Sequence, residues 1–462
     1  MSMTFLSASD LLAELRGKNL SAADLMQATL DHIDAVNPAL NAIVSLRDRD
    51  DLMAEARDAD QATNRGALHG LPIAVKDLAN VAGLRSTQGS PALADFIPQQ
   101  DDLVVERMRR AGAIFIGKTN TPEFGLGSHT FNPVHGATLN PYDPTRTCGG
   151  SSGGAAVALA AGMLSLADGS DMMGSLRNPA GWNNVYGFRP SWGRVPSEPG
   201  GDLYLHQLST LGPMARNPSD IELLLDVMAG ADPRVPLSRN LQDLQGSAGP
   251  KRIGWLGDWD GAMSMEPGVL AQCETALKVF EELGHEVEPV APPFPAEQIW
   301  ESWITLRSFA VAAGLKTYVG REDQLKDTAI WELQRGLSMS GAQIQKASEQ
   351  RSNWHRVAVR LFETYDALVM PTAQCWPFEV DIDYPREIAG VGMDTYHRWM
   401  QVVVPVSLLG LPSLAAPAGF GAAGLPMGIQ IFGALGRDRE ILELGKGYHE
   451  ATKWPEKRPP PR

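Results

Sequence analysis

The stretch Cys148-Gly-Gly-Ser-Ser-Gly-Gly154 decides the fold of this chain, because its glycines and serines lead directly into an alanine-rich helix pattern. Backbone amides and a helix dipole at such a turn polarise a nearby hydroxyl. The stretch contains a G-x-S-x-G match, which in α/β-hydrolases marks a nucleophile between a strand and a helix. The preceding segment 140–148 is rich in proline and turn residues, so we expect no strand there. A flexible Gly/Ser linker is the alternative meaning of this composition.

Two further stretches carry reactive residue types. His69-Gly-Leu-Pro-Ile-Ala-Val-Lys-Asp77 is a short apolar run, typical of a strand, that ends in Lys76. Gly169-Ser-Asp-Met-Met-Gly-Ser-Leu-Arg-Asn-Pro179 is a second glycine turn that bears serine. Taken alone, a lysine at the end of a strand is usually a solvated cap.

Together the three stretches resemble the amidase signature family, whose catalytic unit is a Ser-Ser-Lys triad. The spacing agrees, since Ser151 follows Lys76 by 75 positions and precedes Ser175 by 24. Further blocks in the same order extend the resemblance over essentially the whole chain, at 118–125, 212–216, 370–372 and 410–430. The resemblance implies an α/β fold with a mixed central β-sheet flanked by helices on both faces.

The resemblance also implies a single amidase-signature domain over residues 1–462. We expect an N-terminal helical brace at about 1–65, a catalytic core at about 66–230 and 400–450, and a variable, substrate-facing segment at about 235–400. Eight of the eleven tryptophans fall in that last segment. They either line an apolar substrate pocket or simply pack in the core.

The implied chemistry gives each member of the triad a role. Ser175 attacks the substrate carbonyl, Ser151 relays the proton, and Lys76 is the terminal base. A lysine accepts a proton only when it is neutral, so its pKa must be lowered toward the working pH by desolvation. The apolar run 71–75 supplies a dry environment. Asp77 would stabilise the charged lysine, so we expect it to point away, toward backbone amides.

The resemblance also implies an oxyanion hole made of the backbone N–H groups of Met172, Met173, Gly174 and Ser175. The usual pattern has two glycines before the nucleophile, whereas this chain has Met173 and then Gly174. We expect the Met173 backbone to avoid positive φ and its side chain to reshape the acyl pocket. Substrate contacts are expected from Ser128, Met172 and Met173.

Supporting roles follow from the same resemblance. Asp171 and Arg177 are expected to brace the nucleophile loop by an ion pair, and Ser152 to form local hydrogen bonds. The peptide bond before the first serine of the triad is cis in the family, which implies a cis bond between Gly150 and Ser151.

The rest of the chain alternates helix and strand patterns, which favours an α/β protein. Ser7 with Asp10 and Ser21 with Asp24 have capping spacing ahead of helical periodicity. Further helices are predicted at 103–110, 155–166, 221–228 and 270–283. Strands are predicted at 71–75, 113–116, 367–370 and 427–432.

Composition excludes several classes of function. The net charge of −14 argues against a nucleic-acid binder. No stretch reaches the roughly 18 to 20 apolar residues that a membrane span needs, and no signal-peptide pattern is present, so we expect a cytoplasmic protein. Cys148, Cys273 and Cys375 fit reduced thiols better than a disulfide framework.

Three other motifs carry weaker alternatives. The segment 112–119 has the letters of a phosphate-binding loop, but its central residues are strand-forming and a turn follows. Glu123, His129 and His135 lack metal-ligand spacing. Cys148 could react with thiol reagents, although a small packing residue is the more ordinary role. We therefore expect no metal and no organic cofactor.

The sequence thus predicts an amidohydrolase acting on amides, and chemically also on esters or carbamates, of small hydrophobic or aryl molecules. Three alternatives stay open. One is the glutamine-hydrolysing component of a tRNA-dependent amidotransferase, which works with a partner protein. A second is an α/β-hydrolase that uses Ser151 or Ser152 with His206 or His285. The third is an inactive binding protein. A homodimer is compatible with all of them.

Overall fold

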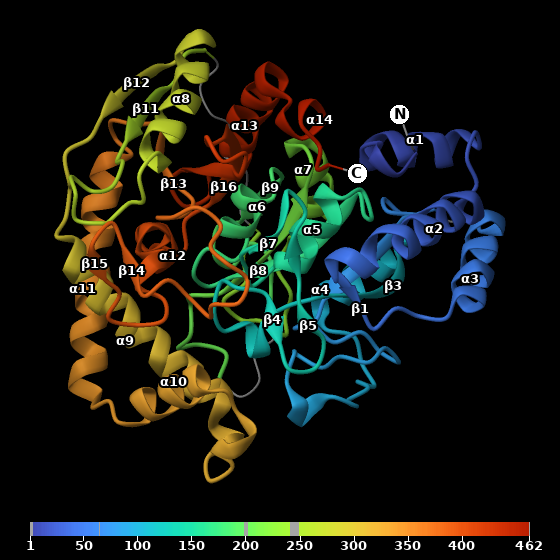
Figure 1. Ribbon diagram of the computed structural model, residues 1–462, viewed down its shortest axis with the longest axis horizontal. Helices are drawn as coiled ribbons and strands as arrows, with labels where there is room; N and C mark the ends of the chain where they lie inside the picture. The colour runs from blue at the N-terminus through green and yellow to red at the C-terminus, as the bar shows by residue number, and fades with distance from the viewer. Residues whose placement is uncertain (1–2, 64, 198–201, 241–248, 462) are drawn as a thin grey trace.

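Two of the predicted strands, at 367–370 and 427–432, lie in the middle of a mixed eight-stranded sheet in the computed structural model, which describes residues 3–63, 65–197, 202–240 and 249–461 (Figure 1). The other two, at 71–75 and 113–116, belong to a smaller sheet. At one end of the large sheet three strands run parallel, and the remaining pairings are antiparallel. The strands, in spatial order, are β12 (Glu286–Pro289), β11 (Arg252–Trp255), β13 (Ala367–Pro371), β17 (Pro426–Phe432), β16 (Ser413–Phe420), β9 (Tyr186–Arg189), β10 (Thr210–Ala215) and β8 (Leu166–Asp171).

A smaller sheet continues the structure beyond β8. It has the order β1 (Ile43–Val44), β3 (Ile114–Thr119) and β2 (Pro72–Lys76), with β2 and β3 parallel. Strand β2 lies beside β8, where the backbone N–H of Lys76 donates to Asp168 Oδ1 at 2.9 Å. The end of β2 therefore meets the end of β8, which places Lys76 next to the turn that follows β8.

Helices cover both faces of the large sheet, as the sequence resemblance implied. On one face α13 packs so closely that a Cβ added at Gly445 would lie 2.1 Å from the Leu414 side chain. On the other face α6 approaches β17, where a Cβ at Gly428 would lie 2.6 Å from Gly181 Cα. The helices are α1 (Ala8–Gly17), α2 (Ala22–Leu40), α3 (Arg49–Gln61), α4 (Leu103–Arg110), α5 (Gly153–Ala160), α6 (Asn178–Trp182), α7 (Pro218–Met228), α8 (Val269–Glu282), α9 (Ala296–Leu315), α10 (Asp327–Leu337), α11 (Gly341–Leu361), α12 (Val404–Leu409), α13 (Asp438–Thr452) and α14 (Trp454–Lys457).

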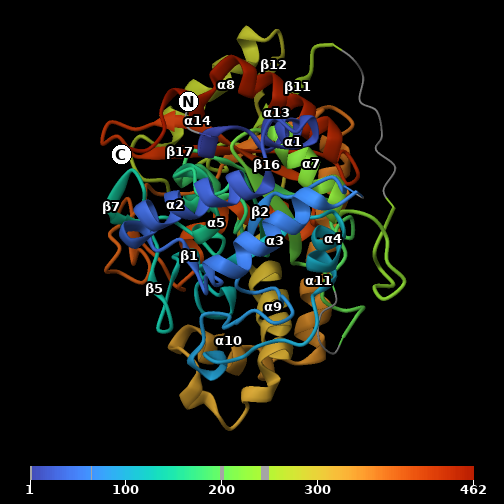
Figure 2. The same ribbon diagram turned by 90° about the vertical axis from the view of Figure 1, so that its right-hand side faces the viewer.

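The first three helices lie together on one flank of the molecule (Figures 1 and 2). Ser7 and Ser21 cap α1 and α2 as predicted, each accepting a hydrogen bond from the backbone three residues on. Asp220 on α7 accepts hydrogen bonds from two backbone N–H groups of the first turn of α1. One apolar cluster extends from Leu11 of α1 to Tyr448 of α13, so these helices share the core of the sheet.

Two predictions about local structure were wrong. The helix predicted at 155–166 ends at Ala160, because Gly162 adopts a φ of 73° and turns the chain into β8. The segment 140–148 contains β7 (Asp143–Thr147), which pairs with β6 (Leu139–Asn140). This pair lies outside the large sheet, where a proline in an edge strand removes no ladder hydrogen bond. The remaining short strands are β4 (Phe131–Asn132), β5 (Gly136–Ala137), β14 (Glu387–Ile388) and β15 (Val391–Gly392).

The tryptophan-rich segment contributes strands β11, β12 and β13 to the large sheet and also includes helix α8, and its middle part forms a helical layer from α9 to α11 (Figure 1). Its tryptophans pack largely against one another and the core. Trp300 stacks on Trp303 with centroids 5.5 Å apart, and Trp354 meets Trp259 edge to face at 5.8 Å. None of the helices in the described residues has both the length and the apolar character needed to cross a bilayer.

The start of α5 offers a test of this packing. A Cβ at Gly154 would lie 2.3 Å from the backbone nitrogen of Asn120 and 2.6 Å from the carbonyl oxygen of Ala42. Backbone atoms cannot move aside cheaply, so Gly154→Ala should lower the free energy of unfolding by about 1–3 kcal/mol or more. Gly341→Ala on α11 has open space around it and should be neutral. Equal unfolding midpoints in denaturant for the two variants would contradict this close approach of α5 to its neighbours.

Candidate active site

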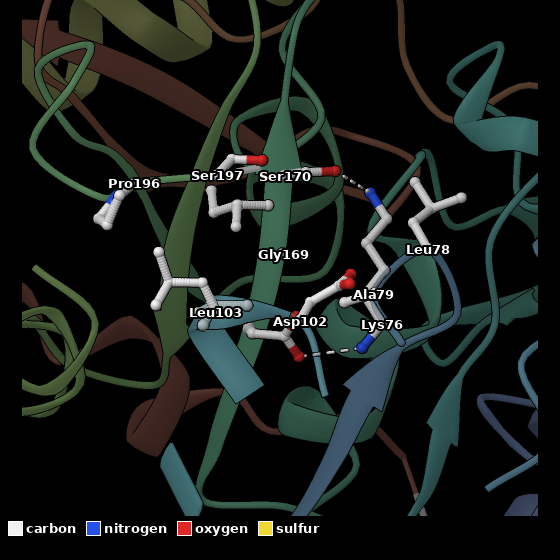
Figure 3. A pocket seen from close by; sticks show the side chains of 12 residues that line it. Lys76, Leu78, Ala79, Asp102, Leu103, Gly169, Ser170, Pro196 and Ser197 are labelled. Carbon is white, nitrogen blue, oxygen red and sulfur yellow. Dashed lines mark hydrogen bonds between the residues drawn. The ribbon is translucent and has the colours of Figure 1, made fainter. Parts of the chain in front are cut away.

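Lys76 lies at the end of β2 with its amine enclosed by hydroxyl groups. Its Nζ donates hydrogen bonds to the side-chain oxygens of Ser151 at 2.8 Å, Ser152 at 2.9 Å and Ser170 at 3.0 Å. Figure 3 shows the lysine chain reaching from the end of β2 to Ser170 on β8. Only 1% of the Lys76 surface is exposed. The structure thus brings the predicted lysine into direct contact with the first serine of the predicted triad.

Burial changes the charge state of this amine. Desolvation lowers the pKa of Lys76 to about 7, against the smaller opposing effect of the negative charges on Asp168 and Asp171. A substantial fraction of the amine is therefore neutral near neutral pH. A neutral amine donates two hydrogen bonds and offers one lone pair, so it can donate to two of the hydroxyl groups and accept the proton of Ser151.

Asp77 points away from the amine, as predicted. Its carboxylate accepts hydrogen bonds from the backbone N–H of Thr87 at 3.0 Å and from the Thr87 hydroxyl at 2.6 Å. Burial raises the pKa of Asp77, while the hydrogen bonds from Thr87 oppose this effect. Asp77, although next to Lys76 in sequence, therefore binds the loop at Thr87 and not the amine.

The turn that carries Ser151 is built on close backbone contacts. The peptide bond between Gly150 and Ser151 is cis, which confirms the expectation from the resemblance. Helix α5 begins two residues later, and a Cβ added at Gly153 would lie only 2.2 Å from Thr130 Oγ1. Glycine is required there because no side chain fits between the helix and its neighbour.

The turn after β8 wraps around the carboxylate of Asp171. Asp171 accepts hydrogen bonds from the backbone N–H groups of Gly174 at 2.8 Å and Leu176 at 3.1 Å. It also pairs with Arg177 at 3.0 Å, as predicted, and with Arg189 at 3.1 Å, and all three side chains are fully buried. Burial alone would raise the pKa of Asp171, but the charges of Arg177 and Arg189 outweigh it and hold that pKa well below its ordinary value.

This arrangement corrects one part of the predicted oxyanion hole. The Gly174 N–H is held by Asp171, so it does not face a substrate oxygen. The N–H groups of Met172, Met173 and Ser175 have no acceptor among the residues that the structure describes. Positive φ falls on Gly174, at 80°, and not on Met173, so the methionine fits its backbone position without strain, as expected.

A cavity of about 100 Å³ opens at these turns. Ser151 and Ser175 both line it, and so do the three residues expected to contact substrate, Ser128, Met172 and Met173. Ser128 also donates to the Gly150 carbonyl oxygen at 2.9 Å. The cavity therefore places two of the predicted triad hydroxyls and the free N–H groups around one small space.

The variable segment reaches this cavity through Arg307 and Met400. The Arg307 guanidinium is held by Glu332 at 2.6 Å and by the Tyr396 hydroxyl oxygen at 2.9 Å. No tryptophan of the described chain lines the cavity. The sequence left open whether these tryptophans line a substrate pocket or pack in the core, and at this cavity they do not form the wall.

Residues weighed for other chemistry lie elsewhere. His129 contacts the Thr147 hydroxyl at 2.8 Å and the Val380 carbonyl oxygen at 2.9 Å, and burial lowers its pKa to about 4. No group of three potential metal ligands occurs among the described residues. Burial raises the pKa of Cys148 to about 12, which leaves an unreactive thiol. Lys118 is buried inside β3 and donates to the Ala79 carbonyl oxygen, so it is not part of a phosphate loop.

Three residues of the site were missed from the sequence. Asp168 and Ser170 stand two positions apart on β8, and both contact Lys76. Their alternation on a strand was a usable signal, since residues two apart share one face of a sheet. Arg307 contacts the Met172 sulfur at 3.3 Å from far along the chain, and no local pattern predicts that contact.

Two serine hydroxyls and residues with unpaired backbone donors line one cavity, and a partly neutral lysine is hydrogen-bonded to one of those serines. These are the components of a serine hydrolase that performs acyl transfer with lysine as its base. The family comparison agrees with that class. The Amidase family model matches residues 24–442, so the chain belongs to the amidase family, whose enzymes hydrolyse C–N bonds of non-peptide amides.

Individual relatives show the range within the family. An acylamidase of Rhodococcus erythropolis is 34% identical, with 98% of this chain and 97% of the relative covered. One Glutamyl-tRNA(Gln) amidotransferase subunit of Thermus thermophilus is 35% identical, with 96% and 97% covered. The crystal structure of a bacterial aryl acylamidase of the amidase signature family superimposes with a TM-score of 0.90 at 27% identity, covering 98% of this chain and 99% of that one.

The pKa of Lys76 gives a prediction for the pH dependence. Protonation fills the lone pair of the amine, so kcat/KM for an amide should rise with pH through about 7 and then level off. Asp168→Asn removes a negative charge that raises the Lys76 pKa but keeps an oxygen for the Lys76 N–H. This variant should shift the rise to lower pH. A rise at an unchanged pH in Asp168→Asn would contradict Lys76 as the titrating group.

Proposed function

We propose that this protein is an acylamidase that hydrolyses amides of small hydrophobic or aryl molecules through an acyl-enzyme on Ser175. The observation that carries the proposal is the 2.8 Å contact between the buried amine of Lys76 and the hydroxyl of Ser151, beside a cavity that Ser175 also lines. The acylamidase and aryl acylamidase relatives support the same substrate class.

The residues divide the reaction into two steps. In the first, Ser175 Oγ attacks the carbonyl carbon while its proton passes to Ser151 and the Ser151 proton passes to neutral Lys76. The oxyanion is stabilised by the N–H groups of Met172, Met173 and Ser175. The C–N bond then breaks, and the amine leaves with the proton returned from Lys76 through Ser151.

The second step regenerates the enzyme. Water attacks the Ser175 ester and gives its proton through Ser151 to Lys76. The bond between the acyl carbon and Ser175 Oγ breaks, and the serine recovers its proton by the same route. Esters and carbamates present the same carbonyl to the same groups, so the mechanism extends to them.

The cavity favours this function over glutamine hydrolysis. Free glutamine carries an ammonium group, and enclosing a charge is costly unless an opposite charge is paired with it. None of the described residues that line the cavity is acidic, and its wall includes the apolar side chains of Met172, Met173 and Met400. Arg307, which also lines it, is already paired with Glu332. The amidotransferase component is the second candidate, favoured by the 35% identity to the Thermus thermophilus protein.

The cavity also gives no support to an α/β-hydrolase mechanism. No histidine is among the described residues that line it. His285 accepts a hydrogen bond from the Lys251 backbone at 3.1 Å, and His206 packs against Phe309 with ring centroids 5.1 Å apart. Neither serves Ser151 or Ser152 as a base.

We further propose that residues 1–462 act as one catalytic unit in the cytoplasm. The shared apolar cluster from α1 to α13 supports the first statement. The three buried cysteines, none of which is in a disulfide, support the cytoplasm, because thiols stay reduced in that compartment.

Covalent labelling tests the nucleophile whatever the natural substrate is. A fluorophosphonate should form its adduct on Ser175, located by peptide mass spectrometry. Ser175→Ala should lose the adduct and reduce hydrolysis of an acetyl anilide by roughly 10³-fold or more. Ser86→Ala is the matched control, because Ser86 is a buried serine that donates to the Leu84 carbonyl oxygen and does not line the cavity. This variant should keep both the adduct on Ser175 and the hydrolysis of the anilide.

Two results would contradict the proposal. An adduct on Ser151 or Ser152 would indicate the α/β-hydrolase mechanism. Turnover of glutamine at a higher kcat/KM than any neutral anilide would indicate the amidotransferase function, and co-purification of a partner protein would strengthen that conclusion.

A further inference from the structure

A second and larger cavity adjoins the one at Ser175. It measures about 450 Å³ and is lined by residues within 192–197, 202–210 and 235–238, by one face of α9 and by Lys316 just after that helix. Most of its lining is apolar, including Trp192, Val195, Leu208, Leu237, Ala310 and Ala313. We call it the apolar chamber. Its charged residues, Asp202 and Lys316, are one of each sign, so its walls carry no net charge.

Two residues belong to both cavities. Met172 and Ser209 line the space at Ser175 and also line the apolar chamber, so the two cavities adjoin at these residues. The chamber therefore continues the catalytic cavity, and one flexible thioether and one small hydroxyl lie where the two meet.

Met172 is held at this boundary by weak contacts. Its sulfur accepts a hydrogen bond from Arg307 Nη1 at 3.3 Å, and sulfur is a poor acceptor. Arg307 itself is fixed by Glu332 and Tyr396. An unbranched methionine changes rotamer easily, so an incoming group can displace the Met172 side chain while the anchored arginine stays in place.

The size of the two cavities determines what each can hold. An apolar cavity of about 150 Å³ accommodates one benzene molecule. The catalytic cavity, at about 100 Å³, is smaller than that, whereas the chamber, at about 450 Å³, is several times larger. A substrate with an aryl or branched alkyl group on each side of its amide bond does not fit the catalytic cavity alone.

We propose that the apolar chamber binds the acyl part of the substrate, with Met172 controlling access to it, so that the preferred substrates are amides of bulky, uncharged carboxylic acids. The inference rests on the proposed acylamidase function. The amine part must lie beside Ser151, which returns the proton to the leaving nitrogen, and Ser151 lines only the catalytic cavity. The acyl part then extends away from Ser151, and the boundary that the two cavities share lies at Met172.

Filling the chamber tests the proposal. Ala310 and Ala313 lie on the α9 face that lines it, and a tryptophan at either position occupies its space. The readout is the ratio of kcat/KM for 3-phenylpropionyl p-nitroanilide to that for acetyl p-nitroanilide. Ala313→Trp and Ala310→Trp should each lower this ratio by about tenfold or more. Val359→Trp, at an exposed position on α11, should leave the ratio unchanged.

Opening the boundary gives the opposite change. Met172→Ala keeps the backbone N–H and joins the two cavities, so the same ratio should rise. Met172→Ala also keeps the proposal testable if the tryptophan variants do not fold. An unchanged ratio in all folded chamber variants would overturn the proposal. The proposal would also be overturned if the chamber variants lost kcat/KM only for acetyl amides of bulky amines, because that result would place the leaving amine in the chamber.

The proposed function and this inference can fail separately. Inactivation rates with a methyl and a 3-phenylpropyl fluorophosphonate give a second ratio, since each places its organic group where the acyl group would lie. That ratio should fall in Ala313→Trp even if wild-type protein hydrolyses no anilide. Wild-type turnover of acetyl p-nitroanilide, lost in Ser175→Ala, supports the acylamidase function independently of the chamber.

Discussion

The enclosed amine of Lys76 is the constraint on which the rest of the structure depends. An ammonium group loses its water shell at a large cost when it is buried, so the protein must either pair it with a carboxylate or accept that it loses its proton. Here the nearest partners of Nζ are three hydroxyl groups, and burial lowers the pKa to about 7. The two aspartates that lower this cost act from farther away. The result is a base that is partly neutral near pH 7 and touches the serine it must deprotonate.

The fold serves this arrangement by joining two sheets at their ends. Strand β2 delivers the lysine, and β8 delivers the turn that carries Ser175. The turn owes its shape to one buried carboxylate, Asp171, which binds two backbone N–H groups and two arginines at once. Removing one partner from a buried ionic cluster typically costs about 3–5 kcal/mol. The same cluster that stabilises the turn also leaves three N–H groups unpaired at the cavity.

The amino-acid sequence was enough to predict the parts of the site that are local. The strand ending in Lys76 and the glycine turn at Ser151 arise within short stretches. The cis bond before Ser151 and the ion pair between Asp171 and Arg177 were implied by the family resemblance of those stretches. Contacts between distant segments were not predictable in the same way. Arg307 contacts Met172, more than a hundred positions away in the sequence. The tryptophans of α9 to α11 pack against one another and the core, and only the folded chain shows these contacts. The strand β7 was missed because its turn residues and proline are tolerated at an isolated edge.

The central claim is that burial lowers the pKa of Lys76 to about 7, so that the neutral amine is well populated near neutral pH, and this pKa can be measured directly. Nuclear magnetic resonance of nitrogen-labelled lysine side chains follows each Nζ signal with pH, and the Lys76 signal is assigned by its loss in Lys76→Arg. The structure predicts a titration near 7 for this signal. A titration near 10.5, the ordinary value for lysine, would show that the amine stays charged and would contradict its assignment as the base.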